Sequence, residues 1–104
     1  MGLELGGNAP FIVCEDADLD IAISALMAAK FRNSGQACIA SNRVLVHRKI
    51  YNEFAEKLAA TVKSKLICGD GFSPSSTLGP LINEQGLNKV LPSLLLVDTS
   101  SIYY

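Results

Sequence analysis

Two short apolar runs separated by a helical pattern constrain this chain more than any other feature of its sequence. The first run, PFIVC, covers residues 10–14 and follows a pair of glycines. The second run, VLV at residues 44–46, comes after a stretch with apolar residues at helical spacing. Parallel strands need a connection of about a dozen residues or more, and this crossover is long enough. We therefore expect an α/β fold built on a βαβ unit, with parallel strands and flanking helices.

The first helix is expected over residues 19–32. Asp18 or Asp20 can accept hydrogen bonds from its first free N–H groups, where the helix dipole favours negative charge. The sequence NSG at residues 33–35 ends it, because glycine readily takes the left-handed conformation of a C-terminal cap. The apolar residues at helical spacing predict a buried stripe of Ile21, Ala25, Ala28 and Ala29, with Leu26 and Phe31 beside it.

The second helix is expected over residues 50–66. Glu53 and Lys57 on its charged face form a favourable i, i+4 pair. After this helix, residues 68–80 are rich in Gly, Ser, Pro and Thr, which predicts a surface loop. The apolar face of the helix is expected to contain Tyr51, Phe54, Ala55, Leu58, Val62 and Leu66.

Composition narrows the possible partners. A chain of 104 residues with 49% hydrophobic residues, 18% charged residues and a net charge of −1 is typical of one globular core. It favours neither disorder nor a basic nucleic-acid interface. The apolar run at residues 91–97 contains Pro92 and is far shorter than the roughly 20 residues that cross a membrane. We expect no nucleic-acid partner, no membrane span and no targeting segment.

The three cysteines stand far apart, without a CxxC pair and with a single histidine, His47. This pattern indicates neither a disulfide framework nor a zinc site, and it favours a reducing compartment. Cys14 lies among apolar strand residues and is expected in the core, whereas Cys68 is expected to be exposed in its loop. His47 ends the second strand, and a surface or capping role is expected for it.

Cys38 and Glu4 are the residues that could carry chemistry. Cys38 follows a helix break near the cation Arg32, a setting that could lower the pKa of a thiol, but a small buried hydrophobe is the alternative. Glu4 lies between leucines and before two glycines that permit close backbone approach, which suits a general base; a solvated terminal glutamate is the alternative. The glycines of residues 68–80 match neither the dinucleotide-binding GxGxxG nor the phosphate-loop pattern.

Three stretches, LELGGNAPFIV, FRNSGQACIASNRVLVH and GPLIN, resemble the aldehyde dehydrogenase superfamily. The ELGG stretch resembles the glutamate signature of that family and NSGQ-x-C its cysteine signature. They set Glu4 and Cys38 thirty-four positions apart, the spacing that the family has. The resemblance predicts that residues 1–90 are part of an aldehyde dehydrogenase catalytic domain and that residues 91–104 are a divergent C-terminal tail.

The resemblance also implies a mechanism. Cys38 would attack an aldehyde to give a thiohemiacetal, with its own backbone N–H stabilising the oxyanion. After hydride transfer to NAD or NADP, Glu4 would deprotonate the water that hydrolyses the thioester. The stretch around Cys38 looks most like succinate-semialdehyde dehydrogenases, in which an arginine at the position of Arg32 grips the substrate carboxylate; a structural ion pair is the alternative for Arg32. Ala40 stands where some members carry a redox-active second cysteine, so no such switch is expected.

The resemblance implies that the cofactor-binding region and the oligomerisation strand lie outside this chain. The parent enzyme would be a homo-oligomer acting on a small-molecule aldehyde, in mitochondria or in the cytoplasm, with mitochondria slightly favoured by analogy. The alternative for the chain itself is a catalytically silent truncated fragment, because a dehydrogenase without a bound cofactor has no hydride acceptor.

Overall fold

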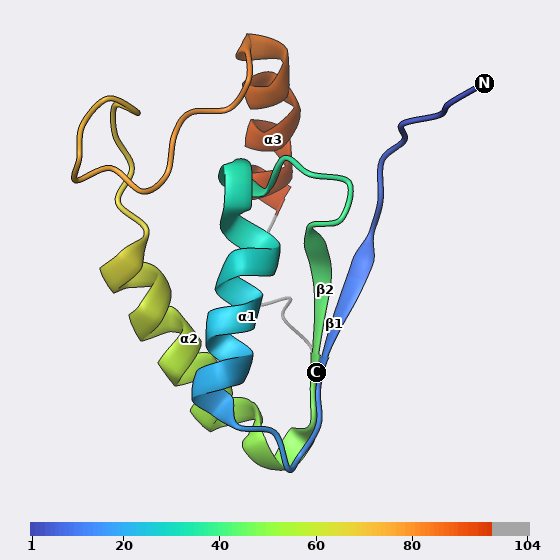
Figure 1. Ribbon diagram of the computed structural model, residues 1–104, viewed down its shortest axis with the longest axis vertical. Coiled ribbons are helices and arrows are strands. Elements are labelled where there is room, and N and C mark those ends of the chain that lie inside the picture. The colour runs from blue at the N-terminus through green and yellow to red at the C-terminus, as the bar shows by residue number, and fades with distance from the viewer. Residues whose placement is uncertain (97–104) are drawn as a thin grey trace.

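The computed structural model describes the backbone of residues 1–96 and the side chains of residues 1–93. In Figure 1, α1 lies between a two-stranded sheet and α2. The two strands are parallel, which confirms the predicted βαβ unit. The elements are β1 (Ala9–Val13), α1 (Leu19–Phe31), the 3-10 turn η1 (Arg32–Gly35), β2 (Ser41–Val46), the 3-10 turn η2 (Arg48–Ile50), α2 (Tyr51–Lys65) and α3 (Glu84–Leu96).

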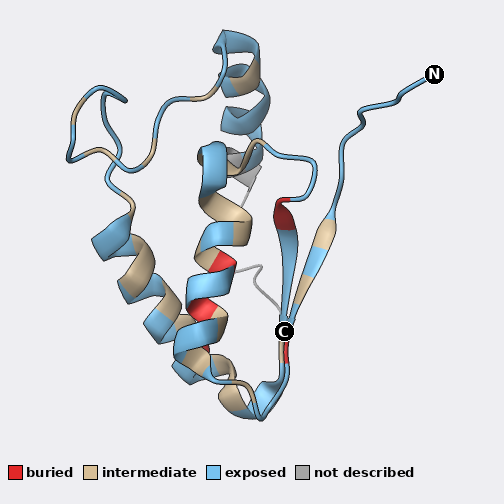
Figure 2. Ribbon diagram, in the orientation of Figure 1, coloured by how far each residue is buried: buried red, intermediate tan, exposed pale blue. Residues whose placement is uncertain are grey.

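The core forms where α1 meets the sheet and α2. Its buried side chains come from β1, α1 and α2, and Figure 2 shows a further buried segment at the start of β2. The predicted apolar face of α2 is confirmed, since Phe54 is buried and the other five residues are half-buried, while Glu53 and Lys57 are exposed. The core residues are Val13, Ile23, Leu26 and Phe54.

The predicted buried stripe of α1 was wrong for most of its members. Ile21 is 69% exposed, and Ala25 and Ala28 are exposed as well. The buried residues are Ile23 and Leu26, at 4% and 1% exposure. The sequence LDIAISALMAAKF is apolar around almost the whole helix, so its periodicity does not select one face; contact with the sheet and α2 selects it.

We expect Leu26→Ala to destabilise the chain by about 2–5 kcal/mol, because it removes a fully buried side chain and leaves a cavity. Ile21→Ala removes a similar side chain from the exposed face, and it should change stability by no more than about 0.5 kcal/mol. Urea unfolding of both variants, followed by circular dichroism, measures the difference. Equal effects of the two substitutions would contradict the assignment of the buried face.

The prediction that Cys14 belongs to the core was also wrong, because Cys14 is exposed. Strand β1 ends one residue earlier, at Val13, and the carbonyl of Cys14 accepts a 3.1 Å hydrogen bond from the N–H of Ala17. The apolar run therefore passes into a turn before it ends. Cys68 is exposed, as predicted.

Helix α3 was not predicted. Gly86 and Pro92 both lie within it and are poor helix formers. The side chain of Asn83 accepts a 2.9 Å hydrogen bond from the N–H of Gly86, in the manner of an N-terminal cap. The predicted divergent tail begins inside this helix, and residues 97–104 lie outside the described residues.

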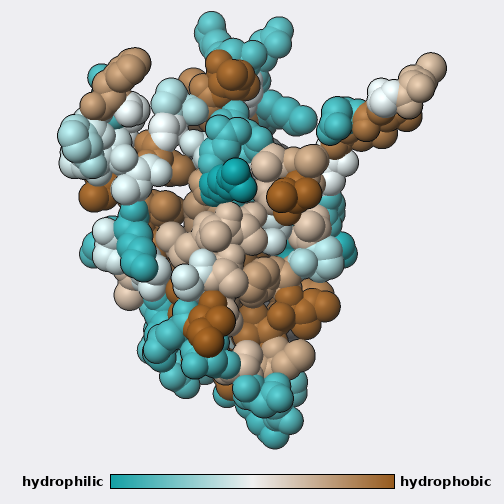
Figure 3. All heavy atoms as spheres, in the orientation of Figure 1, coloured by the Kyte–Doolittle hydropathy of each residue, from teal (hydrophilic) through white to brown (hydrophobic). Residues whose placement is uncertain are grey.

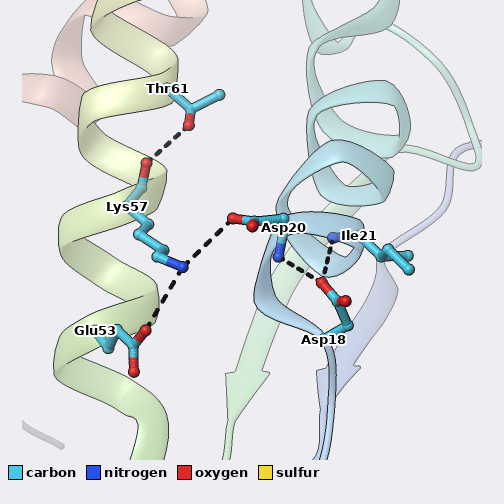
Figure 4. Close-up of polar contacts among 6 residues, drawn as sticks. All are labelled: Asp18, Asp20, Ile21, Glu53, Lys57 and Thr61. Atoms are coloured by element: carbon cyan, nitrogen blue, oxygen red, sulfur yellow. Dashed lines mark hydrogen bonds and ion pairs between the residues drawn. The ribbon is translucent and has the colours of Figure 1, made fainter.

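Polar contacts fix the start of α1 and join it to α2 (Figure 4). The Oδ1 atom of Asp18 accepts hydrogen bonds from the N–H groups of Asp20 and Ile21 at 2.9 and 3.0 Å, which confirms Asp18 as the cap. Lys57 Nζ lies 3.4 Å from Asp20 and 3.5 Å from Glu53, so the predicted i, i+4 pair forms. The hydrogen bond from Lys57 to Asp20 is the main cause that raises the pKa of Lys57 above its usual value.

Candidate active site

The chain leaves α1 through three consecutive left-handed residues. Asn33, Ser34 and Gly35 have φ angles of 52°, 56° and 76°. For residues other than glycine this conformation costs roughly 1–2 kcal/mol each, so other contacts have to hold it. The side chain of Asn33 donates a 3.2 Å hydrogen bond to the carbonyl of Gln36, and the side chain of Gln36 donates one of 3.2 Å to the carbonyl of Asn33. The predicted helix stop is confirmed, and the turn directs the chain toward Cys38.

The same turn is tied to the segment of residues 79–83, the GPLIN stretch. The hydroxyl of Ser34 donates a 2.8 Å hydrogen bond to the carbonyl of Gly79, forty-five positions away. The side-chain oxygen of Gln36 accepts a 3.0 Å hydrogen bond from the N–H of Ile82. Two side chains of the NSGQ sequence therefore hold this distant segment beside the loop that carries the cysteine.

Cys38 lies in a tight turn before β2. The N–H of Ala40 donates a 3.0 Å hydrogen bond to the carbonyl of Ala37, which closes the turn around Cys38. The cysteine is exposed rather than packed in the core. No hydrogen bond within residues 1–96 engages its backbone N–H.

The ELGG stretch meets the cysteine loop, which is residues 36–40 around Cys38, through its second glycine, Gly7. A Cβ atom at Gly7 would overlap the carbonyl oxygen of Cys38 and lie 3.1 Å from its carbonyl carbon. The two stretches enter adjacent parallel strands, with Ala9 paired to Ser41 at the start of the sheet. The close backbone approach expected after Glu4 therefore exists, and it is to the backbone of Cys38 itself.

Glu4 and Arg32 lie at the edges of this junction. Glu4 is exposed on the N-terminal arm, which runs away from the sheet in Figure 1. Figure 3 shows apolar atoms along this arm, where Leu3 and Leu5 are 70% and 71% exposed. Arg32 is exposed at the C-terminal end of α1, where its backbone leaves the helical conformation. The described residues thus bring the two backbones together, while the carboxylate and the guanidinium remain in solvent.

Two hollows on the surface lie away from the cysteine loop. One lies beside the ends of β1 and β2, where Lys49 bonds Glu15 at 2.6 Å. His47 lines it and caps η2 by accepting from the N–H of Lys49, in the capping role predicted for it. The other hollow lies between α1 and α2. Glu4, Arg32 and Cys38 line neither of them.

Sequence reasoning missed two residues that join the ELGG stretch to the start of β2. The side-chain amide of Asn42 donates a 3.3 Å hydrogen bond to the carbonyl of Gly7. The guanidinium of Arg43 donates one of 3.1 Å to the carbonyl of Asn8. Both partners are thirty-five positions away, and no local pattern marks polar residues at the start of a strand as long-range bridges.

The start of α1, Gly71 and Gly79 do not form a phosphate-binding turn for a dinucleotide cofactor. The start of α1 carries the acidic residues Asp16, Asp18 and Asp20, which repel phosphate from its N-terminal amides. A side chain at Gly71 or Gly79 would meet open space, so neither glycine forms the close backbone approach of a phosphate-binding turn. Among residues 1–96 there is also no cluster of three or more side chains able to hold a metal ion. No helix in this part of the chain is long and apolar enough to cross a membrane.

Comparison with known proteins identifies related chains. The model of the aldehyde dehydrogenase family matches residues 1–94. The mitochondrial succinate-semialdehyde dehydrogenase of Arabidopsis thaliana is 57% identical over 90 residues, which are 86% of this chain and 17% of that protein. The NADP-dependent succinate-semialdehyde dehydrogenase of Escherichia coli K12 is 54% identical over 90 residues, 86% of this chain and 18% of that protein.

A solved structure is also similar to this chain in both fold and sequence. The crystal structure of succinate-semialdehyde dehydrogenase from Burkholderia pseudomallei superimposes with a TM-score of 0.83 at 52% identity, covering 89% of this chain and 19% of that one. The chain spans less than a fifth of the length of these relatives. The family model covers nearly all of the chain, and the solved structure shares the parallel-stranded fold described above. The chain belongs to the aldehyde dehydrogenase family.

Proposed function

We propose that this chain supplies the nucleophile and the general base of an NAD(P)-dependent aldehyde dehydrogenase that oxidises succinate semialdehyde to succinate. The observation that carries the proposal is the junction at which Gly7 of the glutamate stretch lies against the backbone of Cys38. The stretch that contains Glu4 thus meets the backbone of a cysteine whose side chain is exposed. Aldehyde oxidation by the full-length protein, measured with and without the thiol of Cys38, tests it.

The exposed position of Cys38 supports its role as nucleophile. Its thiolate would attack the aldehyde carbonyl, forming a carbon–sulfur bond and placing negative charge on the former carbonyl oxygen. The backbone N–H of Cys38 carries no hydrogen bond among the described residues and is available to that oxygen. Sulfur also serves as a leaving group when the acyl group is later transferred to water.

Glu4 is proposed as the base of the hydrolytic step. Its ionised carboxylate accepts a proton from the water that attacks the thioester carbon, and Cys38 leaves as the thiolate. Gly7 keeps the chain three residues after Glu4 in contact with the cysteine loop. The arm between them is exposed, so in this proposal the rest of the full-length protein places Glu4 against the thioester.

The proposed cofactor is NAD or NADP, which supplies the hydride acceptor when bound. Neither the start of α1 nor Gly71 or Gly79 forms a phosphate-binding turn, so we place the phosphate-binding residues in the larger part of the protein that the relatives have and this chain does not span. We likewise propose that the full-length protein is a homo-oligomer located in mitochondria or the cytoplasm. Residues 1–90 are proposed as catalytic-domain sequence and residues 91–104 as a divergent tail.

The exposed face of the sheet supports the proposal that residues 1–90 are only part of a domain. Ile12 and Leu45, which pair across the two strands, are 67% and 54% exposed, as expected for a surface that the remaining domain covers.

Arg32 is proposed as the residue that binds the carboxylate of the substrate. It is exposed six positions before Cys38, and its guanidinium offers paired donors to a carboxylate. No ion pair engages Arg32 among residues 1–96, so the alternative of a structural ion pair has no partner within them.

We expect Arg32→Leu in the full-length protein to lower kcat/KM for succinate semialdehyde by about 10- to 100-fold, because a charge-assisted hydrogen bond contributes about 1.5–3 kcal/mol. The kcat/KM for butanal, which has a similar chain length without the acid, should change by less than about threefold. Arg48→Leu, at an exposed arginine in η2, is the matched control and should leave both values unchanged. Equal losses on the two aldehydes would show that Arg32 has a structural role instead.

A further inference from the structure

We propose that Asn42 is a positioning residue that, together with Gly7, fixes the carbonyl of Cys38 and so holds the turn that aims the backbone N–H of Cys38 at the reacting oxygen. This inference rests on the proposed role of Cys38 as nucleophile. It concerns how the chain holds that residue, and it assigns a role to a side chain that contacts neither the sulfur nor the substrate.

The contact at Gly7 leaves no tolerance for a side chain. A Cβ atom there would overlap the carbonyl oxygen of Cys38, and both groups belong to the backbone, so neither can rotate away as a side chain would. Gly6, one residue earlier, has nothing within 4 Å of a Cβ atom built on it. Of the two adjacent glycines, only Gly7 is required by contact with the described residues.

Asn42 holds the Gly7 backbone in this place. Its amide nitrogen donates a 3.3 Å hydrogen bond to the carbonyl of Gly7, and its oxygen accepts a 3.0 Å hydrogen bond from Lys30 Nζ near the end of α1. Its neighbours Ala40 and Ser41 are 3% and 4% exposed, so the backbone beside Asn42 is anchored in the interior. The side chain therefore connects a fixed strand start and a helix end to the otherwise exposed ELGG arm.

The backbone of Cys38 is restrained on two sides. The hydrogen bond between Ala40 and Ala37 closes the turn that contains Cys38, and Gly7 lies against the carbonyl group of Cys38. Because a peptide group is planar, the hydrogen bond accepted by the carbonyl of Ala37 also orients the N–H of Cys38, which lies in the same plane, while Gly7 limits the next plane, which contains the carbonyl of Cys38. Loss of the Asn42 bond would let the arm move away, and the oxyanion donor would lose its alignment without any change to the sulfur atom.

The test uses the full-length enzyme carrying this segment. Gly7→Ala should lower kcat by about 100-fold, the effect of roughly 1 Å of misplacement, with KM changed by less than about threefold. Asn42→Asp keeps an acceptor for Lys30 but loses the donor to Gly7, and it should lower kcat by about 3- to 10-fold. Gly71→Ala, in the loop of residues 68–80, and Asn52→Asp, at an exposed position on α2, are the matched controls and should retain kcat.

The rate of alkylation by iodoacetamide, measured at each cysteine by mass spectrometry, distinguishes a positioning role of Asn42 and Gly7 from a general loss of stability. Positioning predicts unchanged alkylation rates at Cys38, Cys14 and Cys68 alongside the lowered kcat, because alkylation depends on the sulfur atom and forms no oxyanion. Unchanged kcat in folded Asn42→Asp, or parallel rises at all three cysteines with a lowered melting temperature in both variants, would overturn the inference. If Cys38→Ala itself retained turnover, the proposed function would fail instead, which distinguishes the two failures.

Discussion

Replacing Cys38 with alanine is expected to abolish aldehyde oxidation by the full-length protein, with kcat lowered by about 10⁴-fold or more. The substitution removes the only protein atom in the proposed mechanism that bonds to the aldehyde carbon, whereas the fold should tolerate it because Cys38 is exposed. The rate of reduced-nicotinamide formation at saturating succinate semialdehyde measures the loss. Mass spectrometry should also detect no acylated protein.

The other two cysteines provide matched controls. Cys14 and Cys68 are both exposed, so Cys14→Ala and Cys68→Ala remove equally accessible thiols. Each variant should keep kcat within about twofold, because neither thiol lies in the cysteine loop. A loss of turnover in either variant comparable to that of Cys38→Ala would contradict the assignment. The 104-residue chain alone should show no steady turnover, and steady turnover that depends on Cys38 would refute the silent-fragment alternative.

Much of the fold could be predicted because its local signals agree. The apolar run at residues 44–46 and the helical periodicity at residues 50–66 are clear signals. The structure contains both elements, with the strand starting earlier, at Ser41. The buried face of α1 could not be predicted, because an alanine-rich helix is apolar on several sides and tertiary contact chooses among them. Helix α3 was missed because its Gly86 and Pro92 lower helix propensity, whereas the Asn83 cap that favours it is a weaker signal.

The candidate site was likewise predicted only in part from the sequence. Residue type alone left alternatives open for Glu4 and Cys38, and the resemblance of the ELGG and NSGQ stretches to the family's signatures pointed to their roles. The helix stop at residues 33–35 followed from its glycine. The bridges that hold the loop did not, because hydrogen bonds such as Asn42 to Gly7 depend on which strands become neighbours. Local sequence thus indicates chemistry and turns, whereas the residues that position the chemistry emerge only once strand pairing is known.

Glu4→Gln is expected to slow steady-state oxidation by about 10²- to 10⁴-fold while leaving acylation of Cys38 intact. Glutamine has nearly the same shape as glutamate but cannot accept a proton from the attacking water. The thioester should therefore accumulate. Stopped-flow absorbance should show a stoichiometric burst of reduced nicotinamide followed by a slow phase, and the protein mass should rise by one succinyl group.

The burst separates the base from the nucleophile, since Cys38→Ala should lose the burst and the steady phase together. Hydroxylamine attacks thioesters without needing a general base, so it should restore turnover to Glu4→Gln and do nothing for Cys38→Ala.

Glu56→Gln, at an exposed glutamate on α2, is the matched control and should retain the wild-type rate. If Glu4→Gln instead lost the burst, Glu4 would act before the thioester forms; if it kept the steady rate, another group would activate the water. Because Gly7 is the residue through which the arm carrying Glu4 contacts the backbone of Cys38, Gly7→Ala should weaken the burst and the slow phase together.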